Sequence, residues 1–278
     1  MIQIFNEDCL VTMQEHIGKN TVDIVLTSPP YNNSRTSHTD YCMETRNCRY
    51  ALYDDNKPND EYCQWICDIF MGYDRILKEN GVVLFNISYG SENPTVMFEC
   101  INDICRKTPF VIADVITWKK RSALPNNVSP NKCTRICEYV YVFCRASEYA
   151  TFKTAKTVKS TSHTGQPFYS ANLFNFIEAD NNDGTNELNN ATFSSELVFK
   201  LLEMYLPTDI NKDEVVVYDN FMGTGTTAFV CSKLGINCYG SEIDPAQVEY
   251  ANNRIMGIKI KNSTKEEEVA EFGLEELF

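Results

Sequence analysis

The sequence lacks any stretch of about 18 consecutive apolar residues, and its N-terminus lacks the basic and then apolar pattern of a secretory signal. We therefore expect an intracellular protein, cytoplasmic or in the nucleoid or nucleus, with no membrane partner. The chain also lacks an excess of positive charge. Its formal net charge of −13 is opposite in sign to that of most nucleic-acid-binding proteins. This balance argues against a nucleic-acid partner without excluding one.

Histidine is scarce, with three residues scattered over a chain of 278. Cysteine is abundant, with twelve residues, but the chain is neither small nor targeted for secretion, so a disulfide framework is not indicated. Two pairs, Cys63 with Cys67 and Cys133 with Cys137, have the spacing of a metal half-site. Because no histidine cluster or CxxC pair accompanies them, we expect reduced, mostly buried thiols and no metal, with structural zinc as the lesser alternative.

The length and the residue pattern indicate an α/β protein. A chain of 278 residues favours one large domain with insertions, or one and a half domains. Strand-like apolar segments alternate with helical segments along the chain. This alternation predicts a doubly wound, mostly parallel sheet with helices on both faces.

Residues 27–31 read TSPPY and follow an apolar run at 24–26 that predicts a buried strand. The two prolines fix φ at about −65° and remove two backbone donors, so the loop offers carbonyl acceptors without competing N–H groups. Ser28 adds a hydroxyl, and Tyr31 adds an aromatic face. This set suits a planar ring stacked on the tyrosine, with an exocyclic amino group held between oxygen acceptors. By itself, however, a proline turn after a strand is more often structural.

A second motif lies far along the chain, where 215–227 read VVVYDNFMGTGTT and 236–244 read INCYGSEID. The pattern predicts a strand that ends in Asp219, a loop with two glycines, a helix, and a second strand followed by Glu242. In nucleotide-type βαβ units the glycines let the backbone approach a ligand. The acid after the second strand can accept hydrogen bonds from ribose hydroxyls.

The charge of this second motif argues against a phosphate ligand. No lysine follows the glycines, so this is not a Walker loop, and Asp219 would repel a pyrophosphate. An acid at that position suits a cationic or amine-bearing ligand. A zwitterionic nucleoside such as S-adenosylmethionine fits both ends, with its amino acid part near Asp219 and its ribose at Glu242. A purely structural βαβ turn is the alternative.

Together the two motifs resemble those of the amino-group DNA methyltransferases of the β, or permuted, class. That family has a (D/N/S)PP(Y/F/W) catalytic motif near its N-terminus and a DPFxGxGT cofactor motif near its C-terminus. This chain has SPPY at 28–31 and DNFMGTGTT at 219–227, and the resemblance covers about 1–145 and 190–256. It implies a Rossmann-like, S-adenosylmethionine-dependent methyltransferase fold with a circularly permuted motif order. The implied activity is site-specific DNA methylation of the restriction–modification type.

The resemblance also implies which residues form the site. The catalytic residues would be Ser28, Pro29, Pro30 and Tyr31. The cofactor-binding residues would be Asp8, Cys9, Asp219, Phe221, Gly223, Gly225, Thr226, Thr227, Glu242 and Ile243. Two features depart from the family pattern: Asn220 replaces the usual proline, and 189–197 lacks the family's His-Pro-x-x-Phe-Pro residues. Those positions frame the cofactor pocket, so the departures bear on affinity more than on activity.

The motif order divides the chain into four parts. They are a catalytic half at 1–145 with a long polar loop at 32–60, a short target-recognition insertion or loop at 146–188, a cofactor-binding half at 189–260, and an acidic tail at 261–278. A loop as long as 32–60 is usually functional or disordered, and here it would cover the catalytic motif and order on DNA. The tail has no predicted function.

Positive charge is concentrated at 106–160, which holds eleven Lys and Arg against three Asp and Glu, a net charge of +8. A basic stripe on one face would neutralise DNA phosphates, and an ordinary solvated surface is the alternative. The candidate DNA-binding residues are Arg35, Lys119, Lys120, Arg121, Lys132 and Arg135. We expect double-stranded DNA as the partner and leave RNA and a homodimer open.

The resemblance implies methyl transfer to the amino group of a base flipped out of the duplex. Tyr31 would stack on that base, while Ser28 Oγ and the Pro29 carbonyl would hold its amino group. Serine at the first motif position leans toward cytosine N4, whereas adenine N6 enzymes are commoner in the family. We favour adenine N6 and keep cytosine N4 as the alternative.

Two other functions compete with this one. Methylation of a protein glutamine amide uses a similar PPY loop, but in those enzymes the glycine loop precedes it, the reverse of the order here. A non-catalytic nucleic-acid-binding module with the same fold would be expected to lose the tyrosine or the ribose acid, and both Tyr31 and Glu242 are present.

Overall fold

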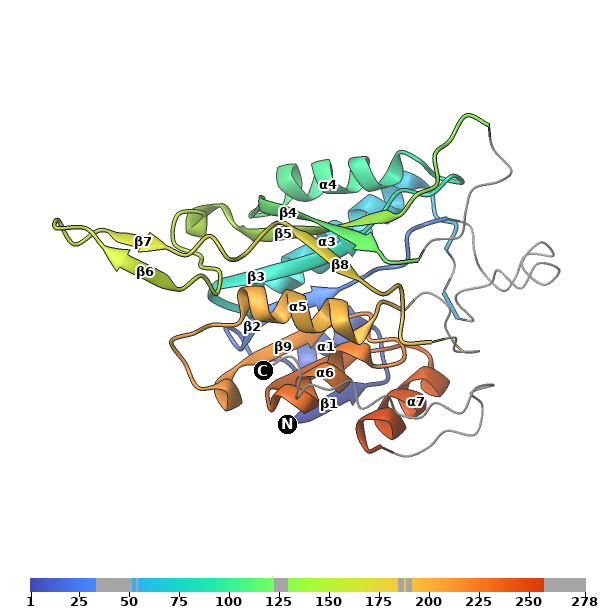
Figure 1. The fold of residues 1–278 in the computed structure, drawn as a ribbon. Helices are drawn as coiled ribbons and strands as arrows, with labels where there is room; N and C mark the ends of the chain where they lie inside the picture. The colour runs from blue at the N-terminus through green and yellow to red at the C-terminus, as the bar shows by residue number, and fades with distance from the viewer. Residues whose placement is uncertain (34–51, 54, 123–129, 185–187, 189–191, 258–278) are drawn as a thin grey trace.

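The computed structural model describes residues 1–33, 52–53, 55–122, 130–184, 188 and 192–257. They form one eight-stranded sheet with helices on both faces, and a separate two-stranded hairpin (Figure 1). The sheet strands are β1 (Ile2–Phe5), β2 (Val22–Thr27), β3 (Leu77–Ile87), β4 (Phe110–Lys120), β5 (Cys137–Arg145), β8 (Phe176–Ala179), β9 (Val216–Asp219) and β10 (Asn237–Ser241). The hairpin strands are β6 (Val158–Thr161) and β7 (Pro167–Tyr169). The helices are α1 (Cys9–Glu15), α3 (Asn59–Ile76), α4 (Val96–Lys107), α5 (Ser195–Tyr205), α6 (Thr226–Leu234) and α7 (Pro245–Ile255), with short 3₁₀ turns at Ala146–Glu148 and Lys212–Glu214.

The strand order of the large sheet is β1-β10-β9-β2-β3-β5-β4-β8. Strand β5 runs antiparallel to both of its neighbours, and the other adjacent pairs are parallel. The predicted mostly parallel sheet is therefore confirmed. The strands nearest the C-terminus, β9 and β10, lie between β1 and β2, so the two predicted halves of the chain share one sheet.

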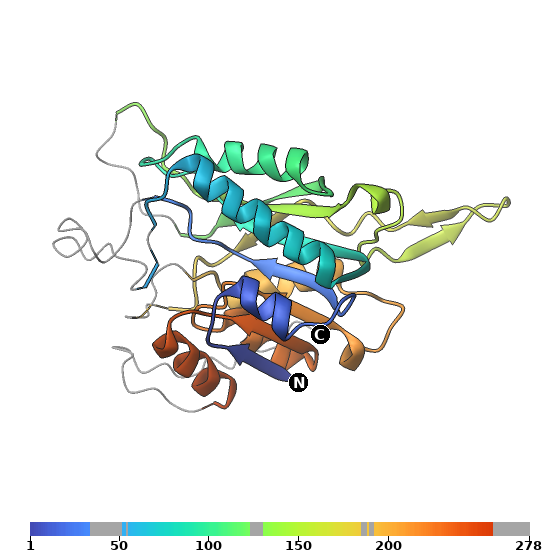
Figure 2. The same cartoon turned by 180° about the vertical axis from the view of Figure 1, so that it is seen from behind.

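Helices cover the two faces of the sheet in separate layers (Figures 1 and 2). Side chains of α1, α3 and α4 pack with Val25 on one face, whereas side chains of α5 and α6 pack with Ile24 and Leu26 on the other. Every residue of β2 is buried. A parallel strand buried on both faces reads as a continuous apolar run, which is why 24–26 shows no polar alternation.

The parallel strands bring several loops to one edge of the sheet. Strands β1, β2, β9 and β10 all point the same way, so the segments that follow them leave the sheet at its carboxyl edge. In open α/β sheets ligands bind at this edge, because the backbone there is free to form a crevice. The TSPPY segment and the glycine loop therefore begin side by side, although they lie far apart in the sequence.

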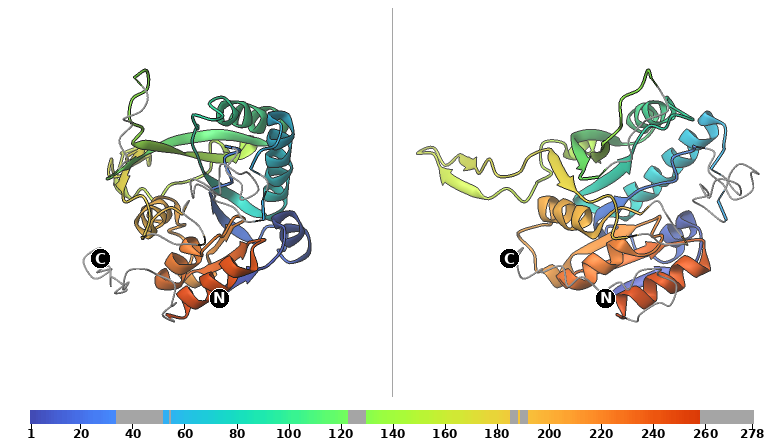
Figure 3. Two further views of the ribbon diagram at one scale, coloured as in Figure 1. Left: turned by 90° about the vertical axis from the view of Figure 1, so that its right-hand side faces the viewer. Right: turned by 45° about the vertical axis from the view of Figure 1, so that its right-hand side comes forward.

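The 146–188 segment has two structural parts. Hairpin β6–β7 projects from the body of the protein, and every residue of its two strands is exposed (Figures 1 and 3). Strand β8 instead pairs with β4, from Thr117 opposite Phe176 to Lys120 opposite Ala179. The end of the predicted recognition insertion therefore belongs to the central sheet. Most of the long loop at 32–60 and the tail at 261–278 lie outside the described residues.

Among the described helices, none is long and apolar enough to cross a membrane. The cysteines of the described segments are free, and most of them are buried. No group of three or more His, Cys, Asp or Glu in the described part of the chain could hold a metal ion.

Candidate active site

A cavity of about 1410 Å³ opens at the carboxyl edge of the sheet. Its lining comes from both ends of the chain: Asp8 after β1, Ser28 and Tyr31 after β2, Phe221 after β9, and Glu242 after β10. Ligand pockets commonly measure about 300–1,000 Å³. This cavity therefore has room for two ligands side by side.

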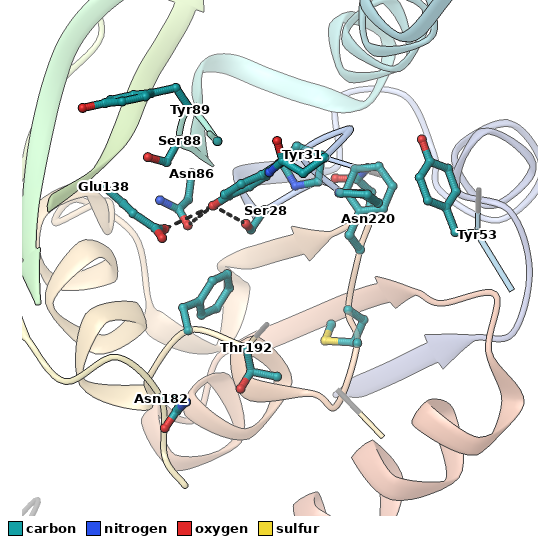
Figure 4. A pocket seen from close by; sticks show the side chains of 18 of the residues that line it. Ser28, Tyr31, Tyr53, Asn86, Ser88, Tyr89, Glu138, Asn182, Thr192 and Asn220 are labelled. Atoms are coloured by element: carbon teal, nitrogen blue, oxygen red, sulfur yellow. Dashed lines mark hydrogen bonds between the residues drawn. The ribbon is translucent and has the colours of Figure 1, made fainter. Parts of the chain in front are cut away.

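The Tyr31 hydroxyl lies at the centre of a polar cluster inside the cavity (Figure 4). Its oxygen is 3.2 Å from Ser28 Oγ, 3.1 Å from Asn86 Oδ1 and 3.2 Å from Glu138 Oε2. The other oxygen of Glu138 accepts a hydrogen bond from Lys120 Nζ at 2.5 Å. The cluster joins the turn after β2 to the end of β3 and the neighbouring strands β4 and β5.

The turn that carries Tyr31 is held by buried polar contacts. The Tyr62 hydroxyl of α3 donates to the Pro30 carbonyl at 2.7 Å. The buried carboxylate of Asp55 accepts from the backbone N–H groups of Asn32 at 2.8 Å and Asn33 at 3.1 Å. Asn32 has φ of 55°, a left-handed conformation that asparagine tolerates better than most residues. These contacts fix the position of the SPPY segment before any ligand arrives.

Asp219 does not border the cavity. Its buried carboxylate accepts hydrogen bonds from Thr227 Oγ1 at 2.6 Å, Thr27 Oγ1 at 3.0 Å and the Phe221 N–H at 3.1 Å. Burial raises the pKa of this carboxyl to about 6, against the lowering effect of those donors. The structure thus ties Asp219 to the glycine loop and to β2, whereas we expected its carboxylate to face the amino acid part of a ligand.

The two glycines of the loop have different surroundings. Gly223 borders the cavity, and its N–H donates to Glu242 Oε2 at 2.9 Å. Gly225 does not border the cavity: it has φ of +83°, and a Cβ there would lie 2.6 Å from the Cβ of Ala251. Gly225 is therefore required for the approach of α7 to α6, and Gly223 is the glycine that faces the cavity. Thr227 also lies away from the cavity, bonded to Asp219.

Glu242 lines the cavity with a partly satisfied carboxylate. One oxygen accepts from the Gly223 N–H, and the other accepts from the Asp244 N–H at 2.9 Å. Burial raises the pKa of Glu242, and the two backbone donors oppose that rise. Each carboxylate oxygen has a second lone pair, so the group can still accept hydrogen bonds from ligand hydroxyls.

The remaining predicted cofactor-binding residues, which are Asp8, Cys9, Phe221, Thr226 and Ile243, all line the cavity. Asp8 also caps α1, because its Oδ1 accepts from the Leu10 N–H at 2.8 Å. Cys9 is buried, and desolvation raises the pKa of its thiol to about 12, so it stays neutral. Phe221 packs against Trp65 with ring centroids 5.5 Å apart, which forms an aromatic wall.

Asn220, the departure from the family's proline, carries a polar group with unused capacity. Its Oδ1 accepts from the buried Tyr73 hydroxyl at 2.5 Å. Its Nδ2 has no hydrogen-bond partner among the described residues. The nearby polar group is the Cys9 thiol, whose pKa burial raises and the Asn220 side chain lowers. Asn220 lines the cavity, but this nitrogen is itself buried in the protein.

The candidate DNA-binding residues fall into three groups. Lys120, Lys132 and Arg135 line the cavity; Lys132 and Arg135 are exposed, and the Arg135 guanidinium donates to the Tyr89 carbonyl. Lys119 and Arg121 do not line it. Arg35 lies outside the described residues.

Much of the expected basic stripe is neutralised by ion pairs. Lys119 pairs with Glu178 at 2.6 Å, and Arg121 pairs with Glu196 at 2.5 Å. Lys120 pairs with Glu138 at 2.5 Å. Carboxylates from β8 and α5 supply the first two partners, and a sequence count over 106–160 could not include them.

Sequence reasoning did not single out Asn86 or Glu138, both of which contact Tyr31. Asn86 is a polar residue near the end of the apolar run of β3, and that position alone marks the carboxyl edge of a buried strand. Glu138 is the second residue of β5 and precedes its apolar run. Both signals were present in the sequence, but neither showed that the two side chains meet at Tyr31.

Comparison with known proteins identifies related sequences and folds. A family model described as DNA methylase matches residues 22–253. The Type II methyltransferase M.BglII of Bacillus subtilis is 24% identical over 287 residues, covering 94% of this chain and 71% of that protein. The orphan methyltransferase M.BamHII of Bacillus amyloliquefaciens is 24% identical over 272 residues, covering 87% of this chain and 92% of that protein.

Solved structures of methyltransferases share the fold. The PvuII DNA methyltransferase, described as cytosine-N4-specific, superposes with a TM-score of 0.66 at 18% identity, covering 97% of this chain and 90% of that chain. The M1.HpyAVI–SAM complex superposes with a TM-score of 0.56 at 20% identity, covering 92% of this chain and 100% of that chain. The predicted fold class is confirmed by these similarities.

Proposed function

The chain belongs to the N6/N4 amino-methyltransferase family of DNA methylases and uses S-adenosylmethionine, and we propose that it methylates adenine N6 in double-stranded DNA through the Ser28–Tyr31 motif. The observation that carries this proposal is the single cavity bordered by both motifs. Ser28 and Tyr31 line one part of it, and Gly223 and Glu242 line another. A base and a methyl donor can therefore meet there without an intermediate carrier.

The residues around the glycine loop fit the cofactor. Glu242 would accept hydrogen bonds from the ribose hydroxyls, while Phe221 and Ile243 supply apolar surface for the purine. When bound, the cofactor supplies an electrophilic sulfonium methyl group. Asp219 would act indirectly, by holding Phe221 and Thr227 in place.

The SPPY segment would hold the target base. A base inside a duplex hides its amino group, so it must flip out, at a cost of about a few kcal/mol. Tyr31 would then stack on the flipped ring, and Ser28 Oγ and the Pro29 carbonyl would accept hydrogen bonds from the amino group. The turn is already fixed by Tyr62 and Asp55, so little order has to be created during the reaction.

Cytosine N4 is the second candidate for the target atom. It is supported by the serine at the first motif position and by the similarity to a PvuII methyltransferase whose description reads cytosine-N4-specific. Both targets present a planar ring with an exocyclic amino group, so the same SPPY contacts serve either. The description of M.BglII as a Type II methyltransferase also supports a role in restriction–modification.

For the DNA contacts we propose Lys132 and Arg135, which border the cavity and are exposed, whereas Lys120 is paired with Glu138. Lys119, Arg121 and Arg35 stay predictions of the sequence, as does a homodimer. Phosphate contacts at the mouth of the cavity would position the duplex and would not read its sequence.

The test is to identify the methylated product. The protein would be incubated with unmethylated double-stranded DNA and S-adenosylmethionine, and the DNA digested to nucleosides for mass spectrometry. N6-methyl-2′-deoxyadenosine would support the proposal, and N4-methyl-2′-deoxycytidine would replace it by the second candidate. Methylation of RNA alone, or of a glutamine peptide alone, would contradict it. A Tyr31→Ala variant serves as the control for a contaminating activity.

A further inference from the structure

The Tyr31 hydroxyl has more oxygen neighbours than protons to donate. It lies within hydrogen-bonding distance of three oxygens, on Ser28, Asn86 and Glu138, yet a phenol carries a single proton to donate. Asn86 Oδ1 is an amide oxygen and can only accept a hydrogen bond. Glu138 Oε2 can likewise only accept while the carboxyl group is ionised. Ser28 is the neighbour that can donate back. The cluster therefore favours one direction for its protons.

The orientation of Asn86 is fixed by a second contact. Its Nδ2 donates to the Tyr139 carbonyl at 3.1 Å, so its Oδ1 is the atom that faces Tyr31. An amide oxygen can hold the phenol in place, but it is too weak a base to keep a proton. Glu138 is a carboxylate, and hydrogen bonds to ionised acceptors are about twice as strong as those between neutral groups. The Tyr31 proton is therefore directed toward Glu138.

Glu138 is in turn held by a cation. Lys120 Nζ lies 2.5 Å from Glu138 Oε1, and the side chains of the pair are 22% and 19% exposed. The lysine also lies over the Trp118 ring, 4.9 Å from its centroid. Lys120 thus occupies one oxygen of the carboxylate and leaves Oε2 to Tyr31. Lys120 and Glu138 both border the cavity. Figure 4 shows Glu138 and Ser28 on either side of the Tyr31 hydroxyl.

We propose that Ser28, Tyr31 and Glu138 form a relay that removes a proton from the target amino nitrogen. The proposal rests on the methyl transfer proposed above and applies to adenine N6 and cytosine N4 alike. If Tyr31 donates to Glu138 and Ser28 donates to Tyr31, a lone pair of Ser28 Oγ is left to accept an N–H of the target. The three side chains then connect the reacting nitrogen to a carboxylate without an intervening water.

Methyl transfer forms one bond and breaks another, and the displaced proton ends on Glu138. The amino nitrogen forms a bond to the methyl carbon, and the carbon–sulfur bond breaks with its electron pair left on sulfur. The nitrogen becomes positively charged and loses a proton to Ser28 Oγ. Ser28 passes its own proton to Tyr31, and Tyr31 passes its proton to Glu138 Oε2, which becomes neutral. The carboxylate also stabilises the positive charge as it develops on nitrogen.

The sharpest variant is Tyr31→Phe, because it keeps the aromatic face and removes only the hydroxyl. Glu138→Gln keeps the size of the side chain and an oxygen for Lys120 but removes the proton acceptor. Each is expected to lower the single-turnover rate of methyl transfer by about 100-fold, the lower end of the usual effect of general acid–base groups. Cofactor affinity, measured by calorimetry, is expected to stay within about twofold.

The matched control is Glu178→Gln. Glu178 lies on β8, which pairs with β4, and forms the same kind of ion pair with Lys119 at 2.6 Å. It does not border the cavity. This variant is expected to keep the wild-type rate. The double variant Tyr31→Phe/Glu138→Gln is expected to be no slower than either single variant, because members of one relay act as a unit. The wild-type rate should also fall in D₂O, and that isotope effect should vanish in both single variants.

The outcomes separate this inference from the proposed function. A wild-type rate in Glu138→Gln, or losses that add in the double variant, would overturn the relay and leave the methyltransferase intact. Failure of the wild-type protein to methylate DNA would overturn the proposed function itself. If Glu138→Gln does not fold, Glu138→Asp provides the test. It retains a carboxylate and should keep more activity than Glu138→Ala, and equal rates of these two variants would also overturn the relay.

Discussion

Thr27 and Asp219 are separated by 192 residues in the sequence, yet the Thr27 hydroxyl donates a hydrogen bond to the Asp219 carboxylate at 3.0 Å. This contact joins the end of β2, which leads into the SPPY turn, to the end of β9, which leads into the glycine loop. The carboxylate is fully enclosed and bonded to three donors. Its environment leads to a prediction about stability and pH.

Asp219 should make the folded state less stable as pH rises through the weakly acidic range. Burial raises the pKa of this carboxyl to about 6. Because the folded-state pKa lies above the unfolded value of about 3.9, the folded protein binds the proton more tightly. Asp219 therefore adds about 3 kcal/mol to the free energy of unfolding below pH 4, and this contribution is lost between about pH 4 and pH 6.

Asp219→Asn should remove that part of the pH dependence, and urea unfolding at pH 4 and pH 7 would measure it. Glu79→Gln, at an exposed position of β3, is the matched control and should unfold with the wild-type pH dependence. If the free energy of unfolding of Asp219→Asn differed between pH 4 and pH 7 by as much as that of the wild-type protein, the raised pKa would be contradicted.

Gly225→Ala should destabilise the protein more than Gly165→Ala does. Both glycines have nearly the same left-handed conformation, with φ of +83° and +84°. A Cβ at Gly165 meets nothing within 4 Å, whereas a Cβ at Gly225 would lie 2.6 Å from the Cβ of Ala251. The shared backbone strain should cost about 1 kcal/mol in each, and overpacking should add about 1–3 kcal/mol at Gly225. Thermal unfolding would show the difference, and equal melting temperatures would contradict it.

Glu242→Gln should weaken binding of S-adenosylmethionine. Replacing the carboxylate removes charge-assisted hydrogen bonds, each worth about 1.5–3 kcal/mol, so the dissociation constant should rise about tenfold or more. Isothermal calorimetry measures this directly, without DNA. Glu249→Gln, an exposed position on α7, should bind the cofactor as the wild-type protein does. Wild-type affinity in Glu242→Gln would remove this residue from the proposed cofactor site.

Tyr31→Ala should abolish methylation more completely than Ser28→Ala. The tyrosine substitution removes the stacking face and the hydroxyl that contacts Glu138, whereas the serine substitution removes one hydroxyl. Methyl incorporation into DNA from labelled cofactor is the measurement, with cofactor affinity measured in parallel as the check on folding. Full activity of Tyr31→Ala would rule out its role at the base.

Lys132→Gln should weaken DNA binding and its dependence on salt. Each phosphate contact releases about one counterion, so loss of one should lower the slope of log affinity against log salt by about 0.9. Lys159→Gln, on the exposed hairpin strand β6, belongs to the same basic segment of the sequence but projects away from the body of the protein. It should leave the slope unchanged. Equal effects of the two variants would favour a continuous basic stripe.

The sequence was sufficient to predict the elements with local causes. Two prolines restrict the turn at 28–31, and the apolar residues at 24–26 require burial on both faces of a sheet. The glycine loop and the acid after β10 follow one another within a single βαβ unit. Their spacing could therefore indicate a nucleoside site at Glu242 without knowledge of the rest of the chain.

The tertiary structure decided where the side chains point and which charges are paired. The Asp219 side chain points into the protein because Thr27 and Thr227 donate hydrogen bonds to its carboxylate there. Position 225 must be glycine because Ala251 packs against it, and not because a ligand lies there. Glu138 reaches Tyr31 across 107 positions of the sequence. Such contacts depend on strand order and on register, where a shift by one residue moves a side chain to the opposite face. No local pattern specifies them, because they form only once distant segments have packed together.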